Sequence, residues 1–437
     1  MKNKILISMI LIIAFMLQVS AQSPVVAPAQ KKPVILSGGT IHTGTGEVIE
    51  NGLIAFTDGK ITYSGKAVNY KTDKSDAEII YVTGKQVYPG LIFPNTSLGL
   101  IEIGGVDVTV DNREIGDLNP NVRAISAYNT DSHVIPVIRS NGILLAQIVP
   151  QGTLLPGTSS IVQLDAWNWE DAIYKGDNGI QLGWPRKASF GGRGGGMSTQ
   201  GAITGASVYD RNVELLEKMF TDALAYSAIE KLKDVNLRLE ALKGLFDGSK
   251  ILFISAVEPK GIIAAISFAK RYGVKKIVLT GADESAWAVK DFLKENNVSV
   301  IIANPLSLPK YDYSDTRLPF KLAALFMKEG ILVGLTYSSQ AYGNLPFAAG
   351  QTVAYGLTKE EALRTVTLNN AKILGIDDKT GSLETGKDAN IVVSTGDILD
   401  MSTNNVELAF ITGRNINLDN KHKQLYRRFK AKYDNMK

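Results

Sequence analysis

The sequence contains no cysteine, and only three of its 437 residues are histidine. The absence of cysteine excludes disulfide bonds, thiol nucleophiles and thiolate metal sites. The histidines, His42, His133 and His422, lie far apart in the chain, and no two of them have the spacing of a metal-binding pair. The sequence therefore does not predict a zinc centre built from several imidazoles.

The chain also has little net charge and a single long apolar run. Its 47 basic and 43 acidic residues give a formal charge of +4, which does not indicate nucleic-acid binding. The apolar run, residues 5–17, follows Lys2 and Lys4 and precedes Val19-Ser20-Ala21, as in a cleavable export signal. We expect cleavage after Ala21, at the end of a signal spanning 1–21, and release into the periplasm or the extracellular space. The run is shorter than the roughly 20 residues that span a bilayer, so it is not expected to be a membrane anchor. No other segment reaches that length without charges, so no membrane contact is expected of the mature chain.

The two ends of the mature chain have similar β patterns. Residues 22–32 contain prolines and lysines and predict a disordered leader. Short β runs broken by glycine turns fill 33–86, including a hairpin around Asp58-Gly59, and comparable runs return in 383–416. We expect these two segments to form one small β-sandwich domain. The basic residues of 417–437 predict a solvated C-terminal helix.

The middle of the chain alternates short apolar strands with helical patterns. The clearest strands are predicted at 251–254, 276–279, 298–302 and 331–335. Their spacing is typical of repeated βα units, which form a parallel sheet covered by helices. Periodicity alone leaves open whether this sheet is a closed barrel or an open one. The length of 87–382 favours a (β/α)₈ barrel, which usually needs about 250 residues.

Three motifs stand out: VYPGLI at 87–92, TLNNAKILG at 367–375 and GSLETGKDAN at 381–390. They resemble motifs of the amidohydrolase superfamily, and most closely those of imidazolonepropionase-like amidohydrolases. This resemblance implies an α/β fold, a TIM-like barrel with a β-sandwich built from both chain ends. It also implies hydrolysis of non-peptide or cyclic carbon–nitrogen bonds by water activated on one or two divalent ions, usually zinc.

The residues that would bind such a metal are missing from the matching positions. Where the superfamily has a His-x-His pair at the end of the first strand, this chain has Asn95-Thr96-Ser97. No histidine ends the later strands, and a serine replaces the last aspartate. The sequence thus predicts a divergent member without a metal or another cofactor. The candidate mouth residues at the former ligand positions are Asn95, Ser97, Ser255, Gly281 and Ser338.

Two functions remain open at this point, and the sequence identifies no catalytic residue for either. In the first, the chain is a pseudoenzyme that binds a small molecule, or a subunit in a homo-oligomer or in a hetero-oligomer with a metal-bearing homologue. Tyr337, Trp167 and Asp165 are then candidates for ligand binding, although the small polar mouth groups could also merely satisfy one another. In the second, it is an active carbon–nitrogen hydrolase that uses carboxylates to hold a metal, or uses no metal. The near full-length resemblance motivates that alternative. The acidic run of 102–117 is interpreted either as a structural calcium site or as solvated loop charge.

Overall fold

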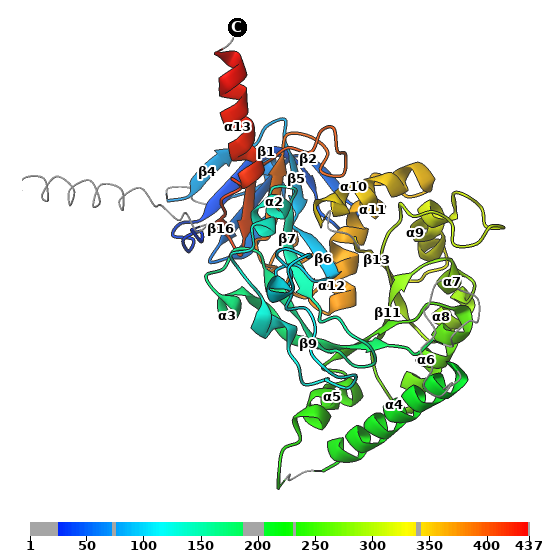
Figure 1. The fold of residues 1–437 in the computed structure, drawn as a ribbon. Helices are drawn as coiled ribbons and strands as arrows, with labels where there is room; N and C mark the ends of the chain where they lie inside the picture. Colours follow the sequence, from blue (N-terminus) through cyan, green and yellow to red (C-terminus); the bar gives the residue numbers. More distant parts are fainter. Residues whose placement is uncertain (1–24, 72–75, 187–204, 230–232, 338–341, 436–437) are drawn as a thin grey trace, which may run out of the picture.

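The structure, a computed structural model, describes residues 25–71, 76–186, 205–229, 233–337 and 342–435. These residues form a barrel-like sheet with helices around it and a second sheet beside it (Figure 1). The predicted α/β class, a TIM-like barrel with a β-rich domain built from both chain ends, is confirmed. Residues 1–24, which include the predicted export signal, lie outside the described residues.

The barrel sheet has eight strands in the order β13-β12-β11-β10-β9-β8-β7-β6. The four strands predicted from the apolar runs beyond residue 250 are present as β10 to β13. Their side chains are almost all buried, as expected for strands covered on both faces. The bounds are β6 (Leu91–Thr96), β7 (Ile143–Ile148), β8 (Gly157–Gln163), β9 (Ile173–Gly183), β10 (Ile251–Ser255), β11 (Ile277–Ala282), β12 (Ser299–Ile302) and β13 (Val333–Leu335).

One strand departs from the parallel pattern of repeated βα units. β8 pairs antiparallel with both β7 and β9, whereas the other neighbours in this sheet pair parallel. Only residues 149–156 connect β7 to β8, and parallel neighbours need a connection of a dozen or more residues. The chain therefore forms a meander here, and the βα repeat begins again after β9.

Helices cover the outside of the barrel and follow the strands in chain order. In α6 the buried residues Ile262, Ala265, Ile266 and Ala269 lie on one face of the helix, as the spacing of an amphipathic helix requires. This face packs into the main hydrophobic core. The helices are α2 (Val134–Arg139), α3 (Trp169–Ala172), α4 (Gly205–Ser227), α5 (Leu237–Asp247), α6 (Pro259–Arg271), α7 (Glu284–Trp287), α8 (Lys290–Glu295), α9 (Leu318–Lys328), α10 (Leu345–Gln351), α11 (Lys359–Val366) and α12 (Leu368–Leu374).

Side chains join the two end strands of the barrel sheet, β6 and β13. The amide nitrogen of Asn370, on α12, donates to the carbonyl oxygen of Ile92 at 2.9 Å and to that of Leu335 at 3.0 Å. The Thr336 hydroxyl also donates to the carbonyl oxygen of Pro94. These bonds satisfy backbone groups that a continued ladder would otherwise pair, and so they close the barrel.

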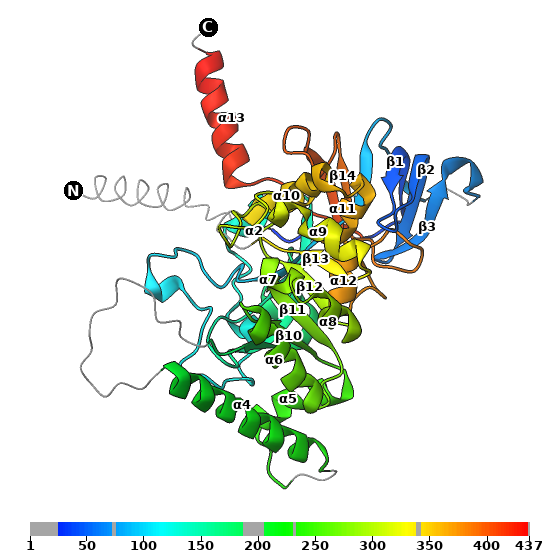
Figure 2. The ribbon, with the colours of Figure 1, turned by 90° about the vertical axis from the view of Figure 1, so that its right-hand side faces the viewer.

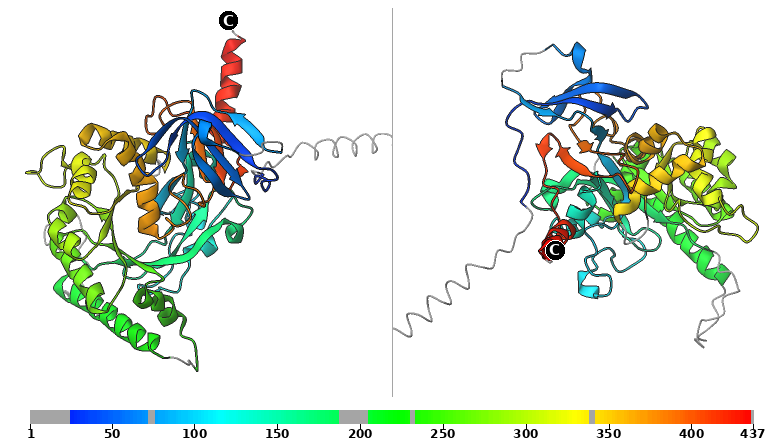
Figure 3. Two further views of the ribbon diagram at one scale, coloured as in Figure 1. Left: turned by 180° about the vertical axis from the view of Figure 1, so that it is seen from behind. Right: turned by 90° about the horizontal axis from the view of Figure 1, so that it is seen from above.

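The second sheet brings the two ends of the chain together, and Figure 3 shows their strands on one side of the barrel. β14 pairs antiparallel with β5, which joins the C-terminal strands to the N-terminal ones. The predicted hairpin at Asp58-Gly59 is present, with positive φ at both residues as a type I′ turn requires. The strands are β1 (Val34–His42), β2 (Val48–Thr57), β3 (Lys60–Lys66), β4 (Glu78–Tyr81), β5 (Gln86–Pro89), β14 (Ile391–Ser394), β15 (Val406–Ile411) and β16 (Arg414–Asn415).

The N-terminal leader contacts the rest of the molecule. Disorder was predicted for 22–32, but the part described, from residue 25, is held in place. The backbone N–H of Ala27 donates to Asp165 at 3.0 Å, and the Gln30 side chain bonds backbone groups of Phe56 and Gly59. The prediction is wrong for these residues because their backbone and side-chain groups find partners in both sheets.

The C-terminal helix α13 (Lys421–Asp434) projects away from the rest of the molecule (Figure 2). None of the helices in the described ranges combines the length and the apolar character needed to cross a bilayer.

Candidate functional site

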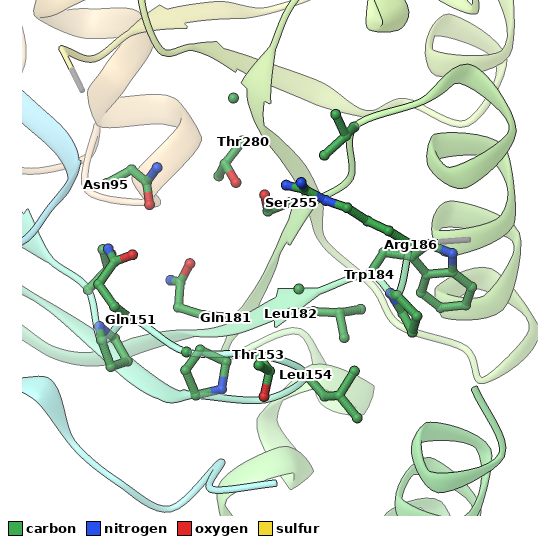
Figure 4. A pocket seen from close by; sticks show the side chains of 18 of the residues that line it. Asn95, Gln151, Thr153, Leu154, Gln181, Leu182, Trp184, Arg186, Ser255 and Thr280 are labelled. Carbon is green, nitrogen blue, oxygen red and sulfur yellow. The ribbon is translucent and has the colours of Figure 1, made fainter. Parts of the chain in front are cut away.

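A pocket of about 470 Å³ lies at the carboxyl ends of the barrel strands (Figure 4). Four strands contribute to it: Asn95 comes from β6, Gln181 from β9, Ser255 from β10, and Thr280 and Gly281 from β11. In barrel enzymes this end of the strands carries the active site, because the loops that follow the strands meet there. The pocket therefore occupies the functional position of the fold.

The backbone of β6 turns at Asn95 as the strand enters the pocket. Asn95 has a φ of +52°, and the register of β6 against β7 shifts between Phe93 and Thr96. Asparagine tolerates this left-handed conformation better than most residues do. The N–H of Asn95 donates to the side-chain oxygen of Gln147 at 3.0 Å, which fixes the turn.

Buried neutral groups form a hydrogen-bonded layer beside the pocket. The Ser159 hydroxyl accepts from the amide nitrogens of Gln147 at 3.1 Å and Gln181 at 3.2 Å, and it donates to Asn178 at 3.0 Å. The side-chain oxygen of Gln181 makes no hydrogen bond within the described part of the chain, and Gln181 lines the pocket. Gln181 is therefore held by its nitrogen and offers an acceptor to a ligand.

Arg186 gives the pocket a positive charge. Its side chain extends into the pocket in Figure 4, and no carboxylate among the described residues pairs with it. A guanidinium remains protonated at all ordinary pH values and offers several donors in one plane. The neighbouring Trp184 is buried, and its indole N–H lacks a hydrogen-bond partner among those residues. The site combines a permanent positive charge on the exposed Arg186 with a free acceptor on Gln181.

The structure brings three of the predicted mouth residues together and separates the others. Asn95, Ser255 and Gly281 line the same pocket, whereas Ser97, one residue beyond β6, does not. Tyr337 packs partly buried against the barrel core, and Trp167 is exposed near α3. Neither aromatic residue lines the pocket, so their role in ligand binding stays a prediction from the sequence. Ser338 lies outside the described residues.

Asp165 was predicted as a ligand-binding residue, and the structure contradicts this. Its buried carboxylate is 2.6 Å from the guanidinium of Arg139 and 2.8 Å from that of Arg414, and it also accepts from the N–H of Ala27. A carboxylate with these three partners has no room for a ligand. Its role is structural, because it links the barrel, the leader and the second sheet.

Sequence reasoning missed several residues that line the pocket. Arg186 follows the end of β9, a strand whose alternation of Ile180, Gln181 and Leu182 was visible in the sequence. A polar residue between two buried apolar ones at the end of a strand is a signal for a group that faces the barrel interior. The missed residues that carry hydrogen-bonding or charged side chains are Gln151, Thr153, Gln181, Trp184, Arg186, Asn212 and Thr280.

The donors in this pocket do not fit the divalent metal that the resemblance implied. Its described lining residues carry amides, hydroxyls and a guanidinium but no imidazole or carboxylate. Elsewhere in the described ranges, no group of three or more His, Cys, Asp or Glu residues could hold a metal ion. The segments 187–204 and 338–341 contain none of these four residue types in their sequence. Zinc requires such ligands, so these residues do not support a metal-dependent catalytic step.

The acidic run of 102–117 does not supply the missing ligands either. Glu102 pairs with His133 at 3.2 Å on the surface, and Asp117 accepts from the hydroxyl of Thr153. Asp111 and Glu114 line a separate, smaller pocket. The carboxylates of this run therefore do not converge on one cation site in the described structure.

Comparison with known proteins agrees with the observed architecture. Residues 229–416 match the model of the amidohydrolase family. An amidohydrolase from Thermotoga maritima MSB8 has a similar structure, with a TM-score of 0.72 and 23% identity over 88% of this chain and 99% of that one. No curated protein matches the chain.

Two further solved structures share the fold at lower similarity. A molinate hydrolase has a TM-score of 0.53 at 16% identity, over 89% of this chain and 95% of that one. An adenosine deaminase from Xanthomonas campestris, with bound zinc, has a TM-score of 0.51 at 14% identity, over 93% of this chain and 99% of that one. At these identities the likeness shows the fold alone.

Proposed function

We propose that this chain, a divergent member of the amidohydrolase superfamily, binds a small polar molecule that carries a carboxylate, without metal-dependent hydrolysis. The observation that carries the proposal is the unpaired guanidinium of Arg186 in a pocket of amides and hydroxyls. A guanidinium matches the two oxygens of a carboxylate in geometry as well as in charge. The pocket volume falls within the range typical of small-molecule sites.

The other side chains suit the rest of such a ligand. Gln181 has a free side-chain oxygen that can accept from an N–H group, and the Asn95 amide can both donate and accept. Leu154 and Leu182 add apolar surface on one wall. An N-acyl amino acid, which joins an amide to a carboxylate, is the simplest molecule with all these groups.

The alternative, hydrolysis of a carbon–nitrogen bond, would need a base beside a hydroxyl nucleophile. The pocket's described lining includes no imidazole or carboxylate to accept the proton of Ser255. Thr153 does donate its hydroxyl to the carboxylate of Asp117, but Asp117 is exposed and does not line the pocket. A binding role therefore has the better support. That the chain acts as the partner subunit of a metal-bearing homologue, or forms a homo-oligomer, stays a prediction from the sequence.

Isothermal titration calorimetry with matched ligands tests the proposal. N-benzoylglycine is the first probe, and its neutral amide, N-benzoylglycinamide, is the control ligand. We expect the carboxylate to bind more tightly, and Arg186→Gln to weaken its binding about tenfold or more, because a charge-assisted bidentate contact is lost. Arg271→Gln, which removes an exposed arginine on α6, should leave the affinity for N-benzoylglycine unchanged. Equal binding of both ligands, or of neither, would contradict the proposal.

The metal content of the purified protein tests the second half of the proposal. We expect less than about one-tenth of a zinc ion per chain after purification without chelator, because the donors at the mouth cannot hold the ion. Plasma mass spectrometry measures this directly. One or two zinc ions per chain would contradict this half of the proposal.

We also propose that the protein is exported to the periplasm or the extracellular space. The support is the sequence of residues 1–21, with two lysines, an apolar run and a small-residue end. N-terminal sequencing of the protein from a periplasmic or secreted fraction should begin at Gln22. An intact Met1 in a cytoplasmic fraction would contradict the proposed export.

A further inference from the structure

The C-terminal helix α13 has no buried residue along its whole length. It begins at Lys421, where the side chain of the N-cap residue Asn420 accepts from the N–H of Lys423. From there it projects from the body of the molecule (Figure 2). A helix of 14 residues is only marginally stable in water without packing partners. The helix therefore lacks a contact that would stabilise it.

One side of this helix carries exposed apolar and aromatic groups. Leu425, Phe429 and Tyr433 are four residues apart and form a stripe, because successive residues turn by about 100° around the axis. Tyr426 widens this stripe on one side. The exposed fractions are 67% for Tyr426, 49% for Phe429 and 60% for Tyr433, so nothing in the described structure covers them.

Basic residues flank the aromatic stripe on both sides. By the same angular spacing, Arg428 and Lys432 lie along one edge and Lys430 along the other. In the described structure no carboxylate pairs with these three residues, whereas Arg427 is paired with Asp419 at 2.8 Å. The helix contains six lysines and arginines against one aspartate. Its exposed face is apolar in the centre and positive at the edges.

We propose that α13 lies on the surface of an anionic lipid bilayer, with its aromatic stripe among the acyl chains and its basic edges at the headgroups. Tyrosine and phenylalanine suit this boundary, and long basic side chains reach the headgroups while their stems stay in apolar surroundings. This arrangement is typical of helices that lie in the plane of a membrane surface. It concerns a surface contact and requires no membrane-spanning segment. It is also independent of the ligand in the barrel.

The main competing occupant is a second copy of this chain. The loop of 101–117 is acidic and exposes Val108 and Ile115, so it could receive a basic aromatic helix. However, this loop is not a groove matched to the helix, whereas basic residues along both edges of α13 fit a flat anionic surface. The bilayer is therefore the occupant that we propose, and the second copy is an outcome that the test distinguishes.

Vesicle co-sedimentation tests this inference on the chain from residue 22 onward, which keeps every described residue and removes the apolar run of 5–17. The probes are vesicles of equal parts phosphatidylglycerol and phosphatidylcholine, and vesicles of phosphatidylcholine alone. We expect binding to the anionic vesicles only. The binding should fall about tenfold or more when the salt concentration rises from about 50 mM to about 500 mM, because surface charges are then screened.

Two combined variants separate the aromatic stripe from the basic edges. Tyr426→Ser with Phe429→Ser and Tyr433→Ser removes the aromatic side chains of the stripe, leaves Leu425 in place and keeps the charge. A second variant replaces Arg428, Lys430 and Lys432 by glutamine. Each should lose most of the vesicle binding. Neither should change the melting temperature by more than a few degrees, because α13 buries nothing in the body.

A matched control removes exposed apolar groups elsewhere, by Val108→Ser with Ile115→Ser. This control should bind vesicles like the parent chain. Equal binding to neutral vesicles, no binding to either kind, or an equal loss in the control would overturn the inference. The inference would also be overturned if the parent chain formed a dimer by light scattering but did not bind vesicles, and the triple serine variant of α13 lost that dimer.

Discussion

Among single residues, His42 links the second sheet to the helices of the barrel. It ends β1, its Nδ1 is 2.6 Å from Oε1 of Glu360 on α11, and its Nε2 is 2.9 Å from Oε1 of Gln86. Its ring stacks on that of Tyr88 at 4.5 Å. Burial lowers the pKa of His42, but the hydrogen bonds to Glu360 and Gln86 and the nearby negative charges outweigh it. The net result is a pKa above the ordinary value of 6.5.

This raised pKa predicts a stability that depends on pH. The folded protein binds the proton on His42 more tightly than the unfolded chain does, so the contribution is fully present below about pH 6.5 and is lost as the pH rises through the higher folded value. We therefore expect His42→Gln to reduce the free energy of unfolding more at about pH 6 than at about pH 9. Urea denaturation across this range measures the difference.

The second histidine paired with a glutamate is the control for this measurement. His133 lies 3.2 Å from Glu102, but its side chain is 69% exposed. Solvent weakens such surface pairs, so His133→Gln should leave the unfolding free energy nearly unchanged at either pH. A difference for His42→Gln that stays constant or grows with rising pH would contradict the prediction.

The mouth residues show which single positions the sequence could locate. Asn95, Ser255 and Gly281 were identified by the resemblance to the superfamily's ligand positions at strand ends, and all three line one pocket in the structure. Arg186 lies after the end of β9. The first half of β9 is polar and has no clear strand pattern, so only the end of this strand was recognisable in the sequence. A pocket residue in this fold can be located from the sequence only when the strand that carries it can be recognised there.

Among the structural elements, α12 closes the barrel between β6 and β13. Asn370 is fully buried and donates to carbonyl oxygens on both strands, whereas the adjacent Asn369 donates only to Val333 on β13 at 2.9 Å. The side chains are tightly packed here, because a Cβ on Gly334 would lie 2.1 Å from the side-chain oxygen of Asn370. Asn370 thus acts as a bridge, and Asn369 as a one-sided contact.

Asn370→Ala should therefore destabilise the protein more than Asn369→Ala. The first leaves a buried carbonyl unsatisfied on each of two strands, at about 1–3 kcal/mol per group, and the second leaves one. We expect a loss of about 2–5 kcal/mol for Asn370→Ala and roughly half of that for Asn369→Ala, measured by urea denaturation. Equal losses would mean that the bridge across the barrel seam contributes nothing beyond an ordinary hydrogen bond.

The same elements show why the sequence predicted half of the barrel better than the other half. β10 to β13 are apolar runs with helices between them, and their spacing alone predicted them. β8 contains the buried residues Thr158, Ser159 and Ser160. Ser159 joins the polar layer beside the pocket, Thr158 donates to the carbonyl oxygen of Pro120, and Ser160 accepts from the N–H of Asp177. Hydrophobic patterning cannot reveal a strand whose buried face is hydrogen-bonded.

In the whole molecule, a buried charge cluster holds distant segments of the chain together. Asp165 follows β8, Arg139 ends α2, Arg414 begins β16, and Ala27 belongs to the leader. Burial lowers the pKa of Arg139, and the Asp165 carboxylate opposes this effect. These contacts join segments up to 387 residues apart, since Arg414 also donates to the carbonyl oxygen of Ala27. No local pattern in the sequence could have predicted them, and the leader was expected to be disordered for that reason.

Because this cluster is buried, removing its single carboxylate should cost far more than removing an exposed one. Asp165→Asn leaves Arg139 and Arg414 without a counter-charge, and breaking a buried pair in this way typically costs about 3–5 kcal/mol. Glu217→Gln is the matched control, since Glu217 is also 2.6 Å from an arginine, Arg271, but on the surface, where such pairs contribute about 1 kcal/mol or less. Urea denaturation compares the two variants, and proteolysis near Ala27 should be faster only in Asp165→Asn, because the leader loses its anchor. If both variants lost the same small amount and the leader stayed protected, the hydrogen bonds of Gln30 would have to be what holds the leader against the second sheet.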